Sequence, residues 1–444
     1  MVKVVIVGAG SGFGGRLSLD ILSREVLRDS TIGLCDIHAG RLEKAAGFVE
    51  RTIAKHDLPA KLEVGTDRRE LLPGADFVVT SVSVGGAAYH GFPADVEVEI
   101  PRKYGIEQSV ADTVSVGAVF RFLRTAPVHL QIFRDIEELA PEAIVLNHTN
   151  PMAMLTWAHH SATNVRNVGL CHGVQGVSRR IARLLEIDYD EMSYSCAGIN
   201  HLAWFTELRR GREDLYPRLR AMLDAPEKIG RETVRFEIMR HFGYFCTESS
   251  EHDSEYMPYF RRTPALLERY GLHKREVLQE PPKKRAWMAD TGIDDQGGPV
   301  GELKLSHEYS SGIMEAVVTD VPYRFNGNVM NDGLIDNLPA RSCVEVPCMV
   351  DSRGVHPCRV PGLPTHLAAL CRSNVAVQEL AVRAVLDKDR GAAFHACCLC
   401  PLAAAVAPLD DIRAMFEELW TAEKDLLLHF DPTHSGPVPE LCAD

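Results

Sequence analysis

The sequence lacks a run of apolar residues long enough to cross a membrane, and it lacks an excess of positive charge. A membrane-spanning helix needs roughly 18 to 20 consecutive apolar residues, and no stretch of the chain reaches that length. The 48 Lys and Arg are outnumbered by 61 Asp and Glu, which gives a formal net charge of -13. Because proteins that bind phosphate backbones need clustered cations, we expect neither a membrane nor a nucleic acid as a partner.

The sequence has the pattern of neither a disulfide framework nor a secretory signal peptide, and we expect it to lack both. The first predicted strand starts at Val2, where a signal peptide would carry a charged segment followed by an apolar one. Twelve cysteines among 444 residues do not indicate a disulfide framework, which is typical of short secreted domains. We therefore predict a cytoplasmic protein whose thiols are reduced and free to bind metal.

What the sequence does contain is an alternation of strand and helix patterns over its first 170 residues. The first run is mostly β-branched, too short for a helix and followed by glycine, so it predicts a buried parallel strand. The predicted strands cover residues 2–7, 31–35, 61–64, 77–82, 143–146 and 165–170, and the predicted helices cover residues 16–27, 40–54, 128–139 and 152–159. This alternation predicts an α/β domain at residues 1–170, with a doubly wound parallel sheet of the Rossmann type.

The alternation stops after residue 170. Alternating aromatic and β-branched residues predict one strand over residues 194–208 and another over residues 343–350, and helical spacing predicts helices over residues 375–386 and 409–429. This mixture predicts an α+β second domain over residues 171–432. Residues 433–444 are rich in proline and polar side chains, which is typical of a loose tail.

A glycine-rich turn directly follows the first strand and consists of Gly8, Ala9, Gly10, Ser11, Gly12 and Phe13. Glycines here let the backbone approach a pyrophosphate, whose charge the following helix N-terminus favours. Phe13 takes the position of the third glycine in the usual Gly-x-Gly-x-x-Gly pattern. Asp36 ends the second strand, where a carboxylate would accept a hydrogen bond from the ribose of NAD, although it could instead cap the next helix. The two features together predict an NAD site.

Polar residues follow two further strands of the predicted sheet. Ser81 and Val82 end one strand, and Asn147 and Asn150 follow the next. Ligands of open α/β sheets bind at this carboxyl edge, so we predict that Ser81, Val82 and Asn147 contact the cofactor. Asn147 and Asn150 would lie beside a hydroxylated substrate. The alternative is that both segments are ordinary turns.

A thiol and an imidazole form a candidate metal site. Cys171 ends the sixth predicted strand, and His201 lies in a strand-like segment that could fold back to the same edge. A thiolate and an imidazole can hold a divalent transition metal and leave positions open for substrate oxygens. The competing interpretation is that Cys171 is an ordinary buried small residue.

The segment from residue 243 to residue 260 concentrates acidic residues, a histidine and three tyrosines. It could form a solvated acidic face with its aromatic rings turned inward. A tyrosine close to a metal could instead act as a base, because nearby positive charge lowers the pKa of a phenol.

Taken in order, these motifs resemble those of glycoside hydrolase family 4, the NAD- and metal-dependent glycosidases. The matching segments are GAGS at 8–11, ADT at 111–113, FRFLRT at 120–125, NHTNPM at 147–152, CHGVQG at 171–176, GINHLAWF at 198–205, TESSEHDSEY at 247–256, SHEY at 306–309 and VEVPC at 344–348. The resemblance covers nearly the whole chain. It implies a fold similar to that of lactate and malate dehydrogenases.

The resemblance also implies a chemistry in which NAD removes a hydride from C3 of a sugar, a base then removes the C2 proton, and the glycosidic oxygen is eliminated before the hydride returns. Cys171 and His201 would bind Mn²⁺ or another divalent transition metal. Tyr256 would be the C2 base, with Tyr244 and Tyr259 as alternatives, and Asp112 would be the acid.

The same resemblance bears on the substrate. Enzymes of this family that act on unphosphorylated sugars carry His after the metal-binding Cys, so His172 implies an unphosphorylated substrate, and it would contact sugar hydroxyls. Gly173 resembles the α-glucuronidase pattern, whereas the TESSEH and ADT segments resemble α-galactosidases and α-galacturonidases. Ser115 and Ala118 depart from the glycines that relatives often have, which could narrow the pocket.

Two further hypotheses stay open. The protein could be an NAD-dependent dehydrogenase of sugars or 2-hydroxy acids, or it could be a sensor that binds NAD without catalysis. Relatives imply a homodimer or a homotetramer that acts on a small glycoside.

Overall fold

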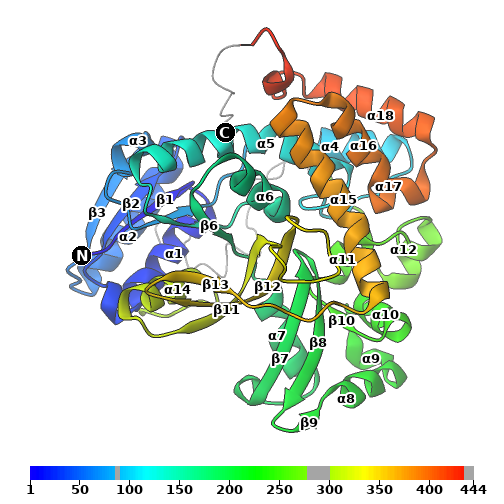
Figure 1. Ribbon diagram of the computed structural model, residues 1–444, viewed down its shortest axis with the longest axis horizontal. Coiled ribbons are helices and arrows are strands. Elements are labelled where there is room, and N and C mark those ends of the chain that lie inside the picture. Colours follow the sequence, from blue (N-terminus) through cyan, green and yellow to red (C-terminus); the bar gives the residue numbers. More distant parts are fainter. Residues whose placement is uncertain (86–90, 278–300, 435–444) are drawn as a thin grey trace.

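A single 13-stranded sheet runs through both halves of the protein in the computed structural model, which describes residues 1–85, 91–277 and 301–434. Along the sheet the strands follow the order β10-β8-β7-β12-β11-β6-β5-β4-β1-β2-β3, while β13 pairs with β12 and β9 pairs with β8. Figure 1 shows the strands of the first half of the chain at one end of this sheet and the β7–β8 hairpin toward the other end. Residues 435–444 of the predicted tail lie outside the described residues.

The N-terminal half has the predicted Rossmann topology. Its parallel strands are β1 (Lys3–Val7), β2 (Thr31–Cys35), β3 (Lys61–Gly65), β4 (Phe77–Thr80), β5 (Ile144–Asn147) and β6 (Arg166–Gly169). Their spatial order, 3-2-1-4-5-6, is that of dinucleotide-binding sheets. Apolar residues fill β1, β4 and β5 because helices cover both faces of the sheet. The predicted doubly wound sheet is confirmed.

The helices of this half confirm the alternation but correct several boundaries. They are α1 (Gly12–Ser23), α2 (Ala39–Lys55), α3 (Arg68–Leu71), α4 (Val96–Lys103), α5 (Val116–Leu139) and α6 (Met152–Ala162). α1 starts four residues before the predicted helix, and a short 3-10 turn (Glu25–Leu27) follows it. α5 starts twelve residues early because residues 116–130 are buried on every side, which erases the amphipathic pattern, and Pro127 lies inside the helix.

The strand predicted over residues 194–208 is wrong, because two strands stand in its place. β7 (Met192–Ile199) and β8 (Leu202–Arg210) form an antiparallel hairpin whose tight turn consists of Asn200 and His201. His201 adopts a positive φ of 62°, and turns with such backbone angles match the twist of hairpin strands. The turn presents the His201 ring at the end of the hairpin.

The second half continues the same sheet through antiparallel strands. The remaining strands are β9 (Glu213–Asp214), β10 (Phe245–Cys246), β11 (Tyr323–Met330), β12 (Cys343–Asp351) and β13 (Gly354–Pro357). β11 joins β6 where Asn328 pairs with Gly169, and β12 joins β7 where Glu345 pairs with Gly198. These junctions bring the β7–β8 turn to the carboxyl edge of the Rossmann strands.

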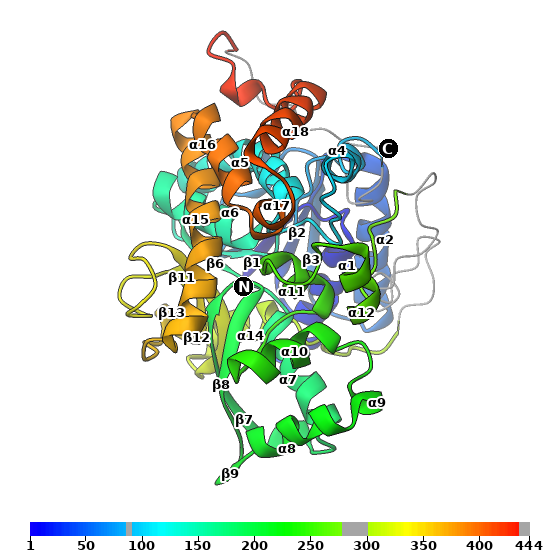
Figure 2. The same ribbon diagram turned by 90° about the vertical axis from the view of Figure 1, so that its right-hand side faces the viewer.

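Helices of the second half cover this sheet and form a separate layer beside α4 and α5. The first group is α7 (Gly173–Leu184), α8 (Tyr216–Ala221), α9 (Pro226–Ile229), α10 (Thr233–Phe242), α11 (Ser250–Tyr256), α12 (Pro264–Tyr270) and α14 (Ser310–Thr319). The second is α15 (Thr365–Asp387), α16 (Arg390–Leu399), α17 (Pro401–Val406) and α18 (Leu409–Ala422), which pack together in Figure 2. The helix predicted over residues 409–429 starts where expected but ends at Ala422.

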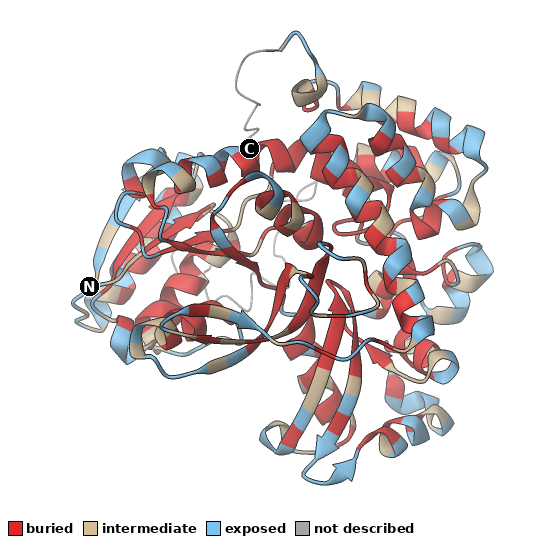
Figure 3. Cartoon of the chain, viewed as in Figure 1, coloured by how far each residue is buried: buried red, intermediate tan, exposed pale blue. Residues whose placement is uncertain are grey.

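The apolar core lies between the sheet and its helices. Central strands are buried along their length, whereas exposed residues gather on the outer helix faces and at the lower end of the β7–β8 hairpin (Figure 3). None of the helices in the described ranges is long and apolar enough to span a bilayer.

Candidate active site

A cavity of about 440 Å³ lies at the carboxyl edge of the Rossmann sheet, where β6, the β7–β8 turn and the start of α11 meet. Nine residues predicted from the sequence line it: Ser11, Phe13, Ser81, Val82, Asp112, Asn150, Cys171, His172 and His201. Glu248, His252, Arg121 and Arg275 also line it, and no role was predicted for them. One cavity therefore brings together segments that are far apart in the chain.

The glycine turn fits tightly against the neighbouring strand. Gly8 has a positive φ of 89°, and a Cβ there would lie 2.1 Å from the carbonyl oxygen of Ser81. A Cβ on Gly14 would lie 2.1 Å from the carbonyl oxygen of Ala9. Gly14 thus allows the helix to pack against the turn, which the usual third glycine does one residue earlier. The backbone of residues 8–12 leads directly into the N-terminus of α1, where a pyrophosphate would bind.

Asp36 holds this turn in place. Its carboxylate accepts hydrogen bonds from the N–H groups of Gly10 and His38, each at 2.8 Å. The cap of α2 is His38, which accepts from the N–H of Arg41, so the alternative role of Asp36 as the cap is wrong. Asp36 lies beside the turn at the end of β2, where a carboxylate would accept a hydrogen bond from the ribose of a dinucleotide.

Asn147 faces the protein interior. It is fully buried, its side-chain oxygen accepts a hydrogen bond from Thr80 at 2.8 Å, and its amide donates to the carbonyl oxygen of Thr149. Thr149 in turn accepts from the N–H of Val82. Asn147 therefore shapes the cavity wall by holding the residues that line it, while Asn150 reaches the cavity itself.

Three potential metal donors converge in the cavity. Atoms of Cys171, His201 and Glu248 lie within 4.8 Å of one another. The Glu248 carboxylate is 3.5 Å from both the Cys171 Sγ and the His201 Nε2. A Cβ on Gly173 would lie 2.3 Å from the same carboxylate, so a larger residue after His172 would push Glu248 away.

The surroundings shift the pKa values of two of these donors in opposite directions. Burial, followed by the charges of Glu248 and Glu345, raises the pKa of the Cys171 thiol well above its usual range. Burial alone would also raise the pKa of Glu248, but the nearby histidines outweigh it and lower that pKa to about 2. A bound divalent cation would favour the thiolate, since metal ligation requires deprotonation.

A buried hydrogen-bond chain stands behind His201. The Tyr256 hydroxyl donates to Thr113 Oγ1 at 2.9 Å, and Thr113 Oγ1 lies 3.0 Å from His201 Nδ1. Tyr256 is 1% exposed and does not line the cavity, and burial raises the pKa of its hydroxyl well above the usual value. Tyr244 packs on Tyr216, and Tyr259 is exposed. Tyr256 is therefore connected to the cavity through Thr113 and the cavity-lining His201.

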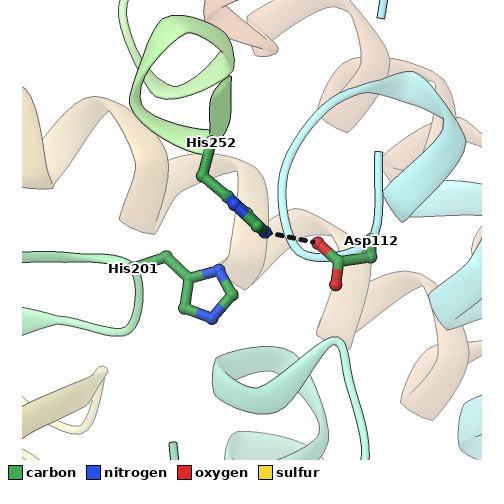
Figure 4. A group of neighbouring side chains, drawn as sticks. All are labelled: Asp112, His201 and His252. Atoms are coloured by element: carbon green, nitrogen blue, oxygen red, sulfur yellow. Dashed lines mark ion pairs between the residues drawn. The ribbon is translucent and has the colours of Figure 1, made fainter. Parts of the chain in front are cut away.

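His252 and Asp112, an imidazole and a carboxylate of the cavity wall, form an ion pair (Figure 4). His252 Nε2 lies 3.4 Å from Asp112 Oδ1, and the amide of Asn150 donates to Asp112 Oδ2 at 3.0 Å. Burial disfavours both charges, but the hydrogen bond and the mutual attraction outweigh it. They lower the pKa of Asp112 below its usual range and raise that of His252 to about 10. The proton of this pair therefore lies on the imidazole.

Sequence reasoning missed Glu248 and His252, although both lie in the acidic segment that it selected. Helical spacing gave no signal for Glu248, because it precedes α11 and has a positive φ of 68°. Thr113 lies in the matched ADT segment, but its contact with His201 spans 88 positions of the chain and was not predicted.

The sheet has the topology of dinucleotide-binding proteins, and a thiol, an imidazole and a carboxylate lie together at its carboxyl edge. This combination defines a class of protein in which a nucleotide and a metal can act on one small molecule. Residues 3–187 match the model of the family described as family 4 glycosyl hydrolase, and residues 196–403 match the C-terminal domain of that family. The chain therefore belongs to family 4 of the glycosyl hydrolases, and the protein is a glycosidase.

Curated relatives cover almost the whole chain. The alpha-galactosidase of Bacillus subtilis (strain 168) is 37% identical over 436 residues, which cover 96% of this chain and 99% of that protein. The alpha-galactosidase of Rhizobium meliloti (strain 1021) is 36% identical, with 95% of this chain and 88% of that protein covered. An alpha-galacturonidase of Thermoanaerobacter italicus (strain DSM 9252 / Ab9) is 25% identical, with coverages of 96% and 97%.

Solved structures share the fold. The lplD protein of Bacillus subtilis superposes with a TM-score of 0.82 at 25% identity, covering 94% of this chain and 99% of that one. A 6-phospho-alpha-glucosidase from gut microorganisms, crystallised with NAD and Mn²⁺, has a TM-score of 0.77 at 20% identity, with coverages of 96% and 98%. Malate dehydrogenase from Plasmodium falciparum has a TM-score of 0.54 at 13% identity, with coverages of 89% and 100%. The predicted similarity to malate dehydrogenase is confirmed.

Proposed function

We propose that the protein hydrolyses α-linked glycosides of unphosphorylated hexoses, α-galactosides first among them, by oxidising the sugar for the duration of the reaction. One observation carries the proposal: the Cys171, His201 and Glu248 donors share a cavity with the end of the nucleotide turn. A hydrolase that only transferred protons would need neither feature.

The residues present fit both cofactors. Sulfur, imidazole nitrogen and carboxylate oxygen together suit Mn²⁺ or a similar divalent ion, and the turn at Gly8 with the α1 N-terminus suits the pyrophosphate of NAD. When bound, NAD would accept a hydride from the sugar and return it, while the metal would stabilise negative charge on the sugar oxygens. Cys171 and His201 would hold the metal, with Glu248 as a third donor.

Asp112 and His252 are our candidates for moving protons. The sequence suggested Asp112 as the acid, but an ionised carboxylate has no proton to donate. We assign the donor role to the His252 imidazolium, and its partner Asp112 holds it in place. His252→Gln should slow hydrolysis of an alkyl glycoside far more than that of a nitrophenyl glycoside, whose leaving group needs no proton. Equal losses for both substrates would refute this assignment.

Tyr256 is assigned a different role from the one its motif suggested. A base must come within hydrogen-bond reach of the proton that it removes, and the Tyr256 hydroxyl points at Thr113 behind the cavity wall. We propose that Tyr256 fixes Thr113 and so orients the His201 ring, as partners of metal-binding histidines commonly do.

Two features bear on the choice of sugar. The alpha-galactosidase relatives are 36% and 37% identical and support an α-galactoside. A hexuronide is the second candidate because Arg121 and Arg275 line the same cavity, and guanidinium groups bind carboxylates well. Asn150 and His172 would contact the sugar hydroxyls in either case.

A screen of nitrophenyl α-galactoside, α-glucoside, α-glucuronide and α-galacturonide, each with NAD, Mn²⁺ and a reductant, tests the proposal. We expect one galacto-configured substrate to be cleaved only when NAD and Mn²⁺ are both present. Stoichiometric accumulation of NADH without cleavage would favour a dehydrogenase instead. Binding of NAD with no turnover of any substrate would favour a sensor.

A further inference from the structure

A second cavity, of about 330 Å³, lies beside the catalytic one. It opens between α7, the start of β7, the segment from residue 306 to residue 309, and the start of β11. Its volume is at the lower end of the roughly 300 to 1,000 Å³ that is typical of small-molecule sites. Neither the nucleotide turn nor the three metal donors line it.

Cationic side chains dominate this second cavity. Arg24, Arg179 and Arg324 line it, and Glu308 is the one acidic residue among its described lining residues. Arg24 pairs with Glu315. Arg179 stacks on the Tyr189 ring at 4.2 Å, its buried Nε lacks a hydrogen-bond partner, and it forms no ion pair with the described part of the chain. Its positive charge is therefore available to an anion.

Arg324 contributes a second available charge. Its guanidinium donates to the carbonyl oxygen of Tyr194 at 2.9 Å and lies 5.9 Å from the centre of the Tyr194 ring. Within the described ranges it has no carboxylate partner. The ring of Tyr189 orients Arg179, and the hydrogen bond to Tyr194 orients the exposed Arg324, so less entropy is lost when they bind an anion.

The cavity also contains an unpartnered acceptor. The amide of Gln175 donates to the carbonyl oxygen of His307 at 3.1 Å, which fixes its orientation. Its side-chain oxygen is buried and has no partner, and the residue is 5% exposed. A buried acceptor without a donor is costly, and a ligand O–H group would satisfy it.

We propose that this cavity binds a small phosphorylated sugar. Arg179 and Arg324 would hold the phosphoryl group through charge-assisted hydrogen bonds, and Gln175 would accept a hydrogen bond from a sugar hydroxyl. The tyrosine rings would pack against the sugar. Two cations and one acceptor match an anion that also carries hydroxyl groups better than they match either a bare phosphate or a neutral sugar.

Residues in the wall between the two cavities could couple binding of this ligand to the binding of the glycoside. Glu308 lines the second cavity, and its two carboxylate oxygens lie 3.8 Å from His172 Nδ1 and 3.9 Å from His148 Nδ1. Both histidines line the catalytic cavity. A ligand that contacts Glu308 or its neighbours would therefore shift His172, and we expect it to change KM for the glycoside. This coupling rests on the proposed function, whereas the binding does not.

Isothermal titration with galactose 6-phosphate tests the binding. We expect the wild-type protein to bind it more tightly than inorganic phosphate or galactose, with a Kd below about 1 mM. Arg179→Gln and, separately, Arg324→Gln should each weaken binding at least about tenfold, as loss of a charge-assisted hydrogen bond does. Arg183→Gln is the matched control, because Arg183 is exposed on the same helix outside the cavity.

Equal binding by the two variants and the wild type, or no binding by the wild type, would overturn the proposal. Loss of binding in Asn150→Ala would also overturn it, since that result would place the ligand in the catalytic cavity. For the coupling, Glu308→Gln should keep the binding but lose the effect of galactose 6-phosphate on KM. If the wild-type KM does not respond to bound ligand, the coupling is wrong while the binding site stands.

Discussion

Cys171 is a proposed metal ligand, and burial raises the pKa of its thiol well above the usual range. Cys171→Ser should weaken Mn²⁺ binding by more than about 100-fold, because loss of residues that only support metal ligands already costs about 10- to 100-fold. Titration of metal-free protein with Mn²⁺ measures the effect. Cys196→Ser is the control, since Cys196 is also buried, on β7, but is not one of the potential metal donors. Similar Mn²⁺ affinities for both variants would remove Cys171 from the site.

Two roles of Tyr256 can be told apart by experiment: the C2 base that its motif suggested, and the positioning of His201 that we propose. If it orients His201, Tyr256→Phe should weaken Mn²⁺ binding about 10- to 100-fold, and saturating Mn²⁺ should restore most of kcat. A collapse of kcat that Mn²⁺ does not restore would instead make Tyr256 the base. Tyr259→Phe, at an exposed position on the same segment, should change neither quantity.

The sequence predicted individual site residues best where the residue type itself suits the chemistry. Cys171 and His201 were identified because thiols and imidazoles bind metal, and both lie together in the cavity. Asn147 was predicted to contact ligands from its place after a strand, yet it faces inward because Thr80 and Thr149 bind its side chain. Orientation of a polar side chain depends on neighbours that one strand does not reveal.

Helices were predictable where one face is buried and one is exposed, whereas the buried parallel strands were predictable as short runs of apolar residues. The start of α5 was not predicted because residues 116–130 are buried on every side and show no amphipathic pattern. The β7–β8 hairpin was predicted as one strand because its turn contains neither glycine nor proline. That turn matters most for function, because it carries His201 to the metal donors.

Strand β12 carries a buried carboxyl whose ionisation should control stability. Burial, then the charge of Glu248, raises the pKa of Glu345 to about 8, and its Oε1 has no partner. Above the usual value of 4.5 the unfolded chain releases this proton while the folded protein keeps it. The free energy of unfolding should therefore fall by about 1.4 kcal/mol per pH unit until the pH reaches about 8.

Glu345→Gln should remove this slope in urea unfolding of the metal-free protein between about pH 5 and pH 8. Glu142→Gln, at a side chain that is 93% exposed, should keep it. Identical slopes for Glu345→Gln and the wild type would show that the carboxyl ionises normally in the folded protein.

The whole molecule joins two halves through a narrow connection in one sheet. β11 meets β6 at a single pair, Asn328 with Gly169, which are 159 positions apart. Sequence patterns predicted the contents of both halves but not this junction, because pairing between distant strands is decided by packing rather than by local preference. The junction places metal donors from the second half beside the nucleotide turn of the first.

This arrangement accounts for a hydrolase built on a dehydrogenase-like fold. The glycine turn and the potential metal donors line one cavity, and in the proposed reaction a hydride would leave the sugar and return while the glycosidic bond breaks. The sugar would therefore not be oxidised overall. A dehydrogenase that used the same cavity would instead release an oxidised sugar and NADH.

Hydrolysis of the accepted nitrophenyl glycoside in D₂O, with NAD and Mn²⁺, tests this account most directly. Removal of the C2 proton exposes that carbon to solvent, so the released sugar should carry deuterium at C2, as NMR spectroscopy would show. Cleavage that proceeds without NAD, or that yields a sugar with its original hydrogen at C2, would contradict the proposed reaction.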